Sequence, residues 1–478
     1  MAFAKAPRYQ QRVLNNSFGD GVNTFLSPFE IKDSELWDME NMNGDVYPAL
    51  AVRPARGQYT SNLTTAAHTI GSRDNEDLHV VTDTVWNKWD IATTAFTALD
   101  STSFTKGKLL DFNKGTFKET IFASTLVVKA YSTAGVVTLS SAAGSSGFNA
   151  PKTRFYTAYK ERLYALKDDT LFHSGNREST NWTGVGAGSL VIGNKRGQAS
   201  GLTAYGDNVF AFTDQSMHQL FGTQPEDFSL VDVSLEVGAA EDRSIKECRG
   251  ILYFLDYKGI YRFAGGSPQP VGDPVKRWVD GINWEAKQRI AAGVLGDKYF
   301  LSIPYGTTTQ LDPNILLEFN SKVGKWYVHS GNFIDFVSIR DNLYGLTSTG
   351  GIANMETTGI TDFPTTSPVA WNMITKPFWD NSVEFRKSLH SMWLVYAVAT
   401  GGSIQLSYSS NVEDSTFNLL ASSTQTIPSF TVDSTQHNSR VLVPLTALQN
   451  VPWYRLKVAG EGQGKIYYMQ RNVRVKGR

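Results

Sequence analysis

Residues 252–263 read LYFLDYKGIYRF, which is a hydrophobic and aromatic strand, a polar turn, and a second strand that begins at Gly259. The first half of this pattern recurs along the chain, at steps of 42 to 47 residues. The copies begin at Leu78, Ile121, Leu163, Val209, Leu252, Tyr299 and Leu343. Four short strands with their turns occupy about forty residues, so this period predicts the blades of a β-propeller.

The composition fits a large all-β protein. Of the 478 residues, 41% are hydrophobic and 12% are aromatic, and aromatic side chains favour strands. The 41 glycines supply the turns that short strands need. Long stretches with the 3.6-residue period of an amphipathic helix are scarce. We therefore predict an all-β fold with a propeller of about seven blades, and the spacing is also compatible with six to eight.

Three regions of the chain differ in their pattern. Residues 1–60 lack the period and read as an extended N-terminal arm with a short helix, which Asp33 or Ser34 would cap. The propeller is expected over residues 61–366. A stretch rich in Pro, Thr and Ser at 361–368 reads as a linker. Residues 369–478 then show short strands with a period of two, which predicts a C-terminal β-sandwich.

The charges of the chain balance, with 45 basic and 45 acidic residues. A protein that coats nucleic acid is normally strongly basic, so direct reading of nucleic acid is not expected. Basic residues without acidic neighbours nevertheless gather at both ends of the chain: Lys5, Arg8, Arg12, Arg471, Arg474 and Lys476. Two interpretations stay open, solvated termini or contact with an acidic partner surface.

No residue pattern marks a catalytic, cofactor or metal site. The sequence contains no P-loop, no GxGxxG fingerprint, no HExxH and no nucleophile elbow. The single cysteine, Cys248, cannot form an intrachain disulfide, and the seven histidines are dispersed. Neighbouring carboxylates read as exposed turn charges: Asp168 with Asp169, Glu241 with Asp242, and Glu413 with Asp414. The sequence therefore predicts a protein that is not an enzyme and uses no cofactor or metal.

No segment predicts a membrane span. The longest apolar run, at residues 392–399, is far shorter than a bilayer requires. The first residues also hold no apolar core of signal-peptide length before Arg8. We therefore expect the chain to fold in the cytoplasm.

The most specific motif lies in the N-terminal arm. It runs from FGDGVN at residues 18–23 to LSPFEIKDSEL at 26–36, continues with ENM at 40–42 and ends with Arg53-Pro54. This series resembles the opening of the tail hub or nozzle proteins of tailed bacteriophages, where such a segment precedes a β-propeller. One departure is the turn RPARG at 53–57, where the family has an RPG-like turn.

The resemblance implies a structural virion protein that is assembled in the cytoplasm of a bacterial host. Such proteins form a ring of copies, by resemblance a hexamer, below the portal and adaptor. DNA leaves the capsid through this conduit as passing cargo, and neighbouring tail proteins or fibres attach to it. The family carries no catalytic residues over to this chain.

Within that interpretation, the arm of residues 1–48 would wrap a neighbouring molecule and become ordered on assembly. Its deletion would leave a folded propeller that no longer attaches to the tail. The residues that we expect to contact partners come from the arm and from the basic C-terminal end: Phe29, Ile31, Leu36, Trp37, Arg471, Arg474 and Lys476.

A different class of function stays open from the residues. It is a carbohydrate-binding or carbohydrate-cleaving propeller for recognition of a host surface. Such a protein would need Trp and Tyr side chains clustered near carboxylates or arginines at the propeller axis. The tryptophans could form such a platform, but propeller and sandwich cores use the same residues.

Overall fold

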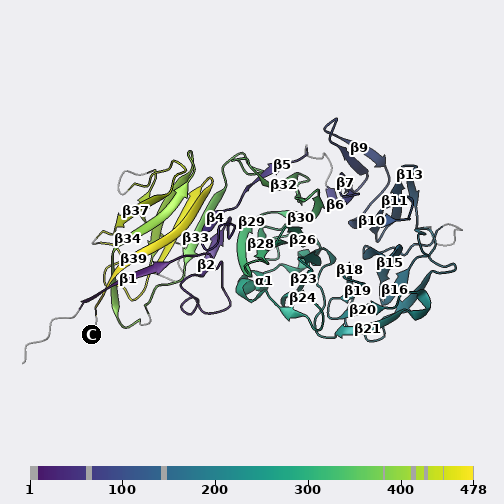
Figure 1. The fold of residues 1–478 in the computed structure, drawn as a ribbon, viewed down its shortest axis with the longest axis horizontal. Helices are drawn as coiled ribbons and strands as arrows, with labels where there is room; N and C mark the ends of the chain where they lie inside the picture. The colour runs from purple at the N-terminus through teal and green to yellow at the C-terminus, as the bar shows by residue number, and fades with distance from the viewer. Residues whose placement is uncertain are drawn as a thin grey trace, which may run out of the picture.

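The computed structural model describes residues 9–60, 67–140, 148–380, 383–410, 416–424, 429–444 and 446–476. Within these ranges the secondary structure is almost entirely strand, so the prediction of an all-β fold is confirmed. The chain forms two bodies that lie side by side, a ring of small sheets and a two-layer sandwich (Figure 1). The ring has the β-propeller fold.

Seven four-stranded antiparallel sheets follow one another around the ring, and we number them as blades in chain order. Blade 1 consists of β6 (Ala67–Arg73), β7 (Asp77–Thr82), β8 (Trp86–Asp90) and β9 (Ala95–Asp100). Blade 2 consists of β10 (Gly107–Asn113), β11 (Lys118–Ser124), β12 (Val128–Ser132) and β13 (Gly135–Thr138). Blade 3 consists of β14 (Tyr156–Tyr159), β15 (Arg162–Lys167), β16 (Thr170–His173) and β17 (Gly188–Val191). Blade 4 consists of β18 (Ala199–Tyr205), β19 (Asn208–Thr213), β20 (Met217–Phe221) and β21 (Ser229–Ser234). Blade 5 consists of β22 (Lys246–Cys248), β23 (Ile251–Asp256), β24 (Gly259–Phe263) and β25 (Gln269–Pro270). Blade 6 consists of β26 (Ala291–Leu295), β27 (Lys298–Ile303), β28 (Ile315–Asn320) and β29 (Lys325–Ser330). Blade 7 consists of β30 (Phe333–Ile339), β31 (Asn342–Thr347), β32 (Ile352–Thr357) and β5 (Ala55–Gln58).

Each repeated anchor of the sequence forms the second strand of its blade. These strands, β7, β11, β15, β19, β23, β27 and β31, are packed between two neighbouring blades and are therefore buried on both faces. In β19, for example, all residues from Val209 to Thr213 are buried. A strand that is covered on both faces reads as a continuous hydrophobic run instead of an alternating one. This is why the second strands gave the clearest periodic signal.

The ring closes with a strand from the other end of the propeller sequence. β5 pairs antiparallel with β32, with Gln58 opposite Ala353 and Ala55 opposite Thr357. The innermost strands β30 and β6 also lie against each other, and Ile70 N–H donates to Asp335 Oδ2 at 2.9 Å. The last blade is thus completed by a strand that precedes the first blade in the chain, and the first and last blades meet at the axis.

The sandwich combines the two ends of the chain. One of its sheets has six strands and the other has five. The first contains β1 (Tyr9–Asn16), β3 (Met42–Asn43), β4 (Leu50–Val52), β34 (Arg386–Val398), β37 (His437–Leu442) and β39 (Gly464–Lys476). The second contains β2 (Leu36–Glu40), β33 (Ala370–Thr375), β35 (Ser403–Ser409), β36 (Asn418–Ser422) and β38 (Arg455–Glu461).

Residues 1–60 do not form a separate arm with a short helix, so this prediction is wrong for the part that the structure describes. β1 to β4 are strands of the sandwich, and β5 belongs to blade 7. The expected helix is replaced by turns and by β2, in which Leu36 and Met39 are buried and which pairs with β33. Strand pairing satisfies the backbone along this segment, so the tertiary contact overrides the local capping pattern.

The helices among the described residues are short. They are η1 (Pro225–Asp227), η2 (Asp242–Ser244), η3 (Asp273–Val275), α1 (Lys276–Asp280) and η4 (Trp284–Arg289). The last three lie between β25 and β26. They link blade 5 to blade 6.

Candidate functional site

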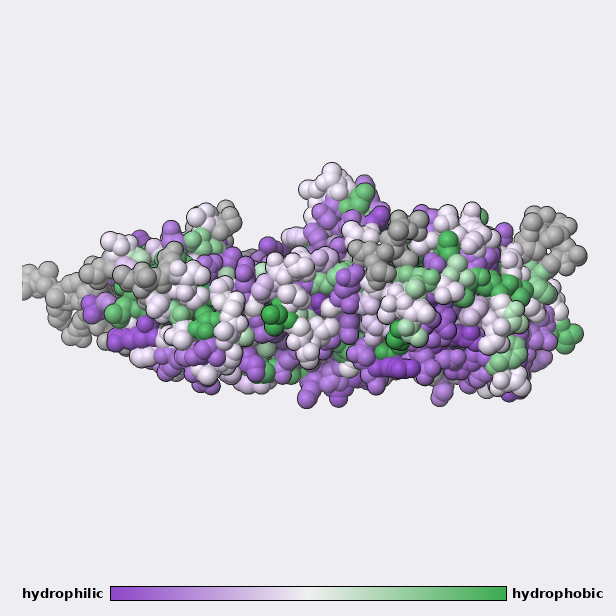
Figure 2. Space-filling view, turned by 90° about the horizontal axis from the view of Figure 1, so that it is seen from above, coloured by the Kyte–Doolittle hydropathy of each residue, from purple (hydrophilic) through white to green (hydrophobic). Residues whose placement is uncertain are grey.

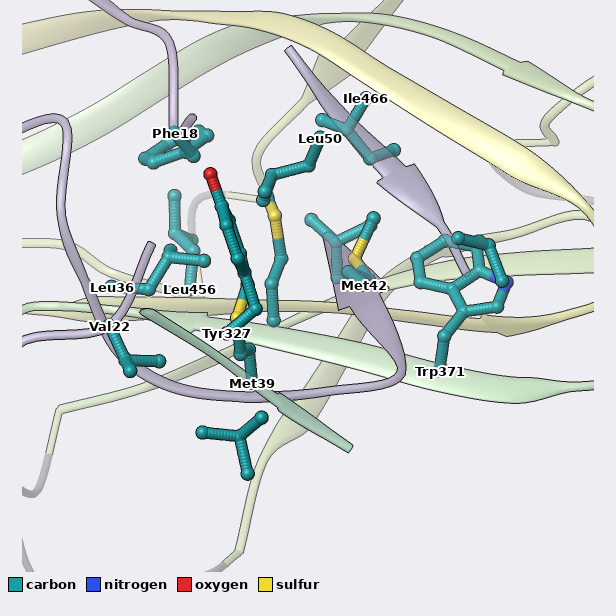
Figure 3. Close-up of a cluster of buried hydrophobic side chains, with 14 of the residues drawn as sticks. Phe18, Val22, Leu36, Met39, Met42, Leu50, Tyr327, Trp371, Leu456 and Ile466 are labelled. Carbon is teal, nitrogen blue, oxygen red and sulfur yellow. The ribbon is translucent and has the colours of Figure 1, made fainter. Parts of the chain in front are cut away.

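The N-terminal segment joins the propeller to the sandwich through one continuous apolar core. In Figure 3, Tyr327 of β29 lies beside Phe18 and Leu36 of the N-terminal segment, and Trp371 of β33 and Ile466 of β39 extend the cluster into the sandwich. All five side chains are at most 2% exposed. Burial of one large apolar side chain contributes about 1.5–3 kcal/mol, so separation of the two bodies would be strongly unfavourable.

A polar clamp holds the same junction. Asn41 Nδ2 donates to the Ala370 carbonyl of the sandwich at 2.8 Å and to Ser330 Oγ of blade 6 at 3.0 Å. Its Oδ1 accepts from Arg53 Nε at 2.9 Å. The Arg53 guanidinium in turn forms two hydrogen bonds, of 2.6 and 3.0 Å, to the Asp362 carboxylate. These bonds fix Asp362, which lies in the stretch that the sequence predicted to be a linker.

Two glycines of the N-terminal motif are required by close backbone contacts at this junction. A Cβ atom on Gly19 would lie 2.3 Å from the Pro48 carbonyl oxygen. A Cβ atom on Gly21 would lie 2.2 Å from the Trp326 carbonyl oxygen, and Gly21 also has a φ of +71°. Only glycine fits such positions without displacing the backbone. The motif of residues 18–54 therefore maps onto the contact between propeller and sandwich.

Three of the seven residues expected to contact partners are buried within the chain itself. Ile31, Leu36 and Arg471 are at most 1% exposed. The Arg471 guanidinium lies 3.4 Å from the centre of the Phe378 ring and donates to Tyr454 Oη at 3.1 Å. These side chains stabilise the sandwich and offer no outer surface in this fold.

Of the other four expected contact residues, three have described side chains, and none of these three is buried. Phe29 is half-buried and packs edge-on against Trp379 and Trp453, with ring centres 6.3 and 5.8 Å away. Trp37 is also half-buried, and Arg474 is exposed on β39. The side chain of Lys476 lies outside the described residues. The structure thus does not gather the seven residues into one surface.

A charged cluster fills the propeller axis. Arg243 of η2, between blades 4 and 5, reaches across the axis to the opposite blades. Its guanidinium donates to the carbonyls of His68 and Ile334 at 3.0 Å each, to Gly107 at 2.6 Å and to Thr69 Oγ1 at 3.0 Å. These acceptors belong to β6, β30 and β10, so one side chain connects blades 7, 1 and 2.

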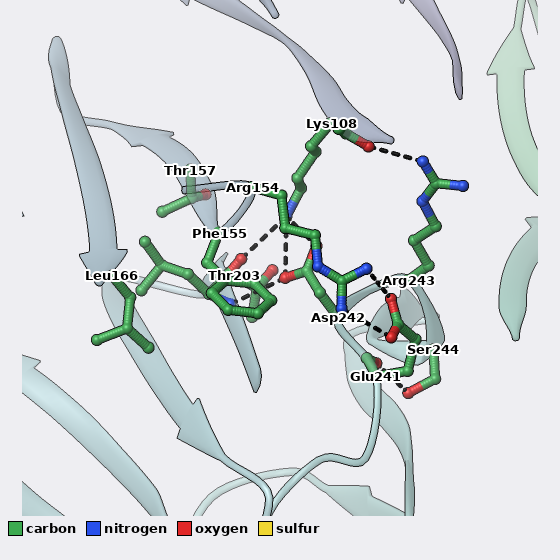
Figure 4. Close-up of polar contacts among 12 residues, drawn as sticks. Lys108, Arg154, Phe155, Thr157, Leu166, Thr203, Glu241, Asp242, Arg243 and Ser244 are labelled. Carbon is green, nitrogen blue, oxygen red and sulfur yellow. Dashed lines mark hydrogen bonds and ion pairs between the residues drawn. The ribbon is translucent and has the colours of Figure 1, made fainter. Parts of the chain in front are cut away.

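Ion pairs surround Arg243 (Figure 4). Arg154 forms a two-pronged pair with Glu241, at 2.7 and 2.9 Å. Lys108 Nζ lies 3.0 Å from Asp242, and Arg243 lies 3.4 Å from Asp335. Glu241 and Asp242 are 0% and 5% exposed, so the prediction that they are exposed turn charges is wrong.

Sequence reasoning missed this cluster because its partners are far apart in the chain. The acidic pair 241–242 stands next to Arg243, but the cations that pair with the carboxylates come from residues 108 and 154. Of the other two pairs, Asp168 is exposed as expected and Asp169 is half-buried, while Glu413 and Asp414 lie outside the described residues. The only signal for the cluster was the run of three charges at 241–243.

Residues of the charged cluster line two cavities. One, of about 230 Å³, is lined by Lys108, Asp242 and Lys246. The other, of about 510 Å³, is lined by His68 and Lys106. Arg243 also lines the smaller cavity, and its bonds place its side chain across the propeller axis.

One serine, one histidine and one aspartate in blade 4 have the connectivity of a hydrolase triad. Ser216 Oγ lies 2.8 Å from His218 Nε2, and His218 Nδ1 lies 2.9 Å from Asp232 Oδ1. Ser216 and His218 are 0% exposed, however, and Ser216 Oγ also bonds to Thr213 Oγ1 at 2.7 Å. A substrate cannot reach this hydroxyl, so the group joins strands instead of forming a nucleophile.

The described residues hold few other candidate sites. Among the residues that the structure describes, no group of three or more His, Cys, Asp or Glu side chains could hold a metal ion. None of the described helices has the length and apolar character to cross a membrane. All eleven tryptophans lie in described ranges, and each is buried or half-buried.

Apolar side chains are exposed along the outer strands of blades 2 to 4. Val137 of β13, Val191 of β17 and Val231 of β21 are 48%, 65% and 48% exposed. These strands lie at the end of the propeller that is farthest from the sandwich (Figure 1). Figure 2 shows hydrophobic residues gathered toward that end of the molecule. Exposed apolar edge strands of this kind are typical contact surfaces.

No protein-family model matches the sequence, and no curated protein matches it. Solved structures with a similar fold include a virginiamycin B lyase from Staphylococcus aureus, with 10% identity over 63% of this chain and 98% of that one, and a TM-score of 0.45. BamB from Moraxella catarrhalis matches with 9% identity over 68% of this chain and 97% of that one, and a TM-score of 0.40. These likenesses concern the propeller fold alone.

The comparison corrects the prediction that the chain is not an enzyme. That prediction rested on the absence of catalytic motifs in the sequence. The solved structures of similar fold include an enzyme, the lyase. Because one fold can host many functions, the absence of such motifs does not exclude catalysis. At this level of similarity, no reaction is assigned to this chain.

Proposed function

We propose that this chain is a structural protein of a bacteriophage tail, which forms a ring of copies and part of the conduit for DNA. The observation that carries the proposal is the position of the N-terminal motif. The residues that resemble the opening of tail hub and nozzle proteins are those that lock the propeller to the sandwich. The motif is thus tied to this two-body architecture, which a ring subunit needs to be rigid.

In this proposal, the conduit for DNA is the lumen that several copies enclose. The axis of a single propeller is filled by Arg243 and its ion pairs, so duplex DNA does not pass through it. A hexamer, which the family resemblance implies, would place the propellers around a shared lumen. The balanced net charge suits a lumen that does not retain DNA.

Contacts between copies are proposed at the outer edge of blades 2 to 4. The exposed apolar strands β13, β17 and β21 form this edge, and the sandwich at the other end is left for adaptor-side tail proteins or fibres. The protein would assemble in the cytoplasm of the host and reside in the virion tail.

Mass analysis and imaging of purified virions test the proposal. We expect several copies of the chain in each particle, arranged as a ring at the tail. Particles made without the chain should have filled heads and an incomplete tail, and they should not infect. Absence of the chain from purified virions would refute the proposed function.

A substitution on the proposed edge tests the contact between copies. Val191→Asp should leave the unfolding temperature of the free subunit nearly unchanged, because the side chain is 65% exposed. It should prevent incorporation into the ring. Val185→Asp is a matched control in the same blade, since Val185 is 99% exposed but lies in a loop before β17. Normal rings with the Val191 variant would place the contact elsewhere.

A further inference from the structure

The charged cluster at the propeller axis contains more basic than acidic side chains. Its basic members are Lys106, Lys108, Arg154, Arg243 and Lys246, and its acidic members are Glu241, Asp242 and Asp335. Each of the three carboxylates is already paired, with Arg154, Lys108 and Arg243 respectively. Lys106 and Lys246 therefore have no carboxylate of their own within the cluster.

Lys106 is the more isolated of these two cations. Its Nζ atom is buried and has no hydrogen-bond partner among the described residues. Burial and then the charge of Arg243 lower the pKa of Lys106 well below its ordinary value. An ammonium group has three donors, and burial without a partner destabilises its charged form, so Lys106 holds its proton weakly until an acceptor is bound. The site is therefore incomplete without a further group.

A second nitrogen without a partner faces the same cavity. His68 Nε2 is buried and has no hydrogen bond of normal geometry within the described part of the chain, although the backbone of Thr82 lies near the ring; Nδ1 lies 2.9 Å from Thr69 Oγ1. The closest carboxylate, that of Asp83, is 3.8 Å from Nε2, and its side chain is 76% exposed. Both His68 and Lys106 line the cavity of about 510 Å³.

We propose that this cavity binds a small oxyanion through Lys106 Nζ and His68 Nε2. A carboxylate or phosphate group supplies acceptors for both nitrogens and a negative charge that offsets the excess of cations. The volume lies in the range of small-molecule sites. Asp83 and Glu285 also line the cavity and would repel a polyanion, so the ligand carries a single acidic group.

Other polar groups of the cavity indicate how such a ligand could extend. Gln288 and Ser348 line it as well and offer partners for hydroxyl groups. Arg289 is already bound to Asp312 and is not needed for the anion. The acidic group can thus belong to a free ion or to a small hydroxylated acid. This site does not depend on ring assembly and goes beyond the proposed tail function.

Calorimetric titration of the full chain tests the site, with phosphate, acetate and glucuronate as anions and glucose as the neutral probe. We expect saturable binding of the anions and no binding of glucose. Lys106→Met should weaken anion binding by about tenfold or more, because a charge-assisted hydrogen bond is lost. Lys322→Met is the matched control, since it removes the same charge from an exposed lysine that lines a different cavity.

Equal anion affinity of the Lys106 and Lys322 variants would overturn the proposal, and so would the absence of binding by all three anions. If glucuronate binds more tightly than acetate, the natural ligand is a hydroxylated acid. If the two bind equally, the natural ligand is a free anion.

A measurement on the unmodified protein covers the case in which the Lys106 variant does not fold. Saturating phosphate should slow acetylation of Lys106 by acetic anhydride, as read from peptide masses, and should leave acetylation of Lys322 unchanged. Acetylation of Lys106 at the same rate with and without phosphate would also overturn the proposal.

Discussion

The propeller axis and the junction between propeller and sandwich both connect distant parts of the chain, but they do so by opposite means. At the axis, Arg243 bonds to backbone carbonyls of three blades and is surrounded by ion pairs. At the junction, apolar side chains such as Leu36 and Tyr327 form a continuous core. The axis depends on directional contacts, while the junction depends on buried area.

This difference predicts different responses to damage. A directional contact between buried charges fails as a unit, because loss of one partner leaves the other charge unpaired. An apolar core loses stability in proportion to the area and volume removed. The junction should therefore fail completely only when whole strands are removed.

Deletion of residues 1–52 should have the largest effect, because it removes β1 to β4 from both sheets of the sandwich. We expect an insoluble or unfolded product, as judged by circular dichroism and thermal unfolding. The sequence led to a different expectation, a folded propeller after deletion of residues 1–48. A soluble product with the unfolding temperature of the full chain would show that the junction is dispensable.

Loss of one ion pair at the axis should have the next largest effect. Arg154→Met should lower the free energy of unfolding by about 3–5 kcal/mol, since it leaves Glu241 buried and unpaired. Arg177 forms a similar two-pronged pair with Glu161, at 2.6 and 2.7 Å, but on the surface. Arg177→Met should therefore cause no measurable change in denaturant unfolding. Equal effects of the two substitutions would contradict the role assigned to burial.

A single truncation in the junction should have a graded effect. Leu36→Ala should destabilise the protein by about 3 kcal/mol, because Leu36 is fully buried between propeller and sandwich. Leu26→Ala is the control, since Leu26 is 43% exposed and lies in the same N-terminal segment. Denaturant titration measures both. Similar losses for the two variants would argue against a core at this position.

The smallest predicted effect comes from a titratable pair in blade 6. Glu318 is buried, its Oε2 lies 2.9 Å from His329 Nε2, and burial raises its pKa to about 7. The folded protein thus binds this proton more tightly than the unfolded chain, and the stabilisation present at pH 5 is lost as the pH rises through 7.

Glu318→Gln removes this titration. At pH 8 the variant should be more stable than the natural protein by about 2 kcal/mol, and at pH 5 the advantage should disappear. His329, whose pKa is lowered well below its ordinary value by burial, is present in both proteins and largely cancels in the difference. A difference that does not change with pH, measured by denaturant unfolding, would contradict the assignment.

The sequence predicted the blades well because their signal is local. The second strand of each blade is buried on both faces, and its hydrophobic run is visible without knowledge of its neighbours. The strands of the N-terminal segment were missed because their partners lie far away. β2 pairs with β33, and the amino-acid sequence of residues 36–40 alone does not indicate this partner.

The charged axis shows the same limit for functional residues. Glu241 and Asp242 look like any acidic pair in a turn, and only the ring brings Arg154 and Lys108 beside them. Lys106 and His68 could not be recognised as neighbours either, because their proximity depends on how blades 1 and 2 pack at the axis.

The closure of the ring by β5 has a consequence for biosynthesis. Ala55 and Thr357 are 302 residues apart, so β5 leaves the ribosome long before β32 is made. Blade 7 and the sandwich must therefore remain incomplete during most of translation, and their apolar N-terminal strands stay unpaired until the C-terminal partners are synthesised. Contacts between residues so far apart in the sequence make folding slow, and strands that are still unpaired are prone to aggregation. The yield of this protein should therefore depend on chaperones and on growth temperature more than that of a propeller closed by adjacent strands.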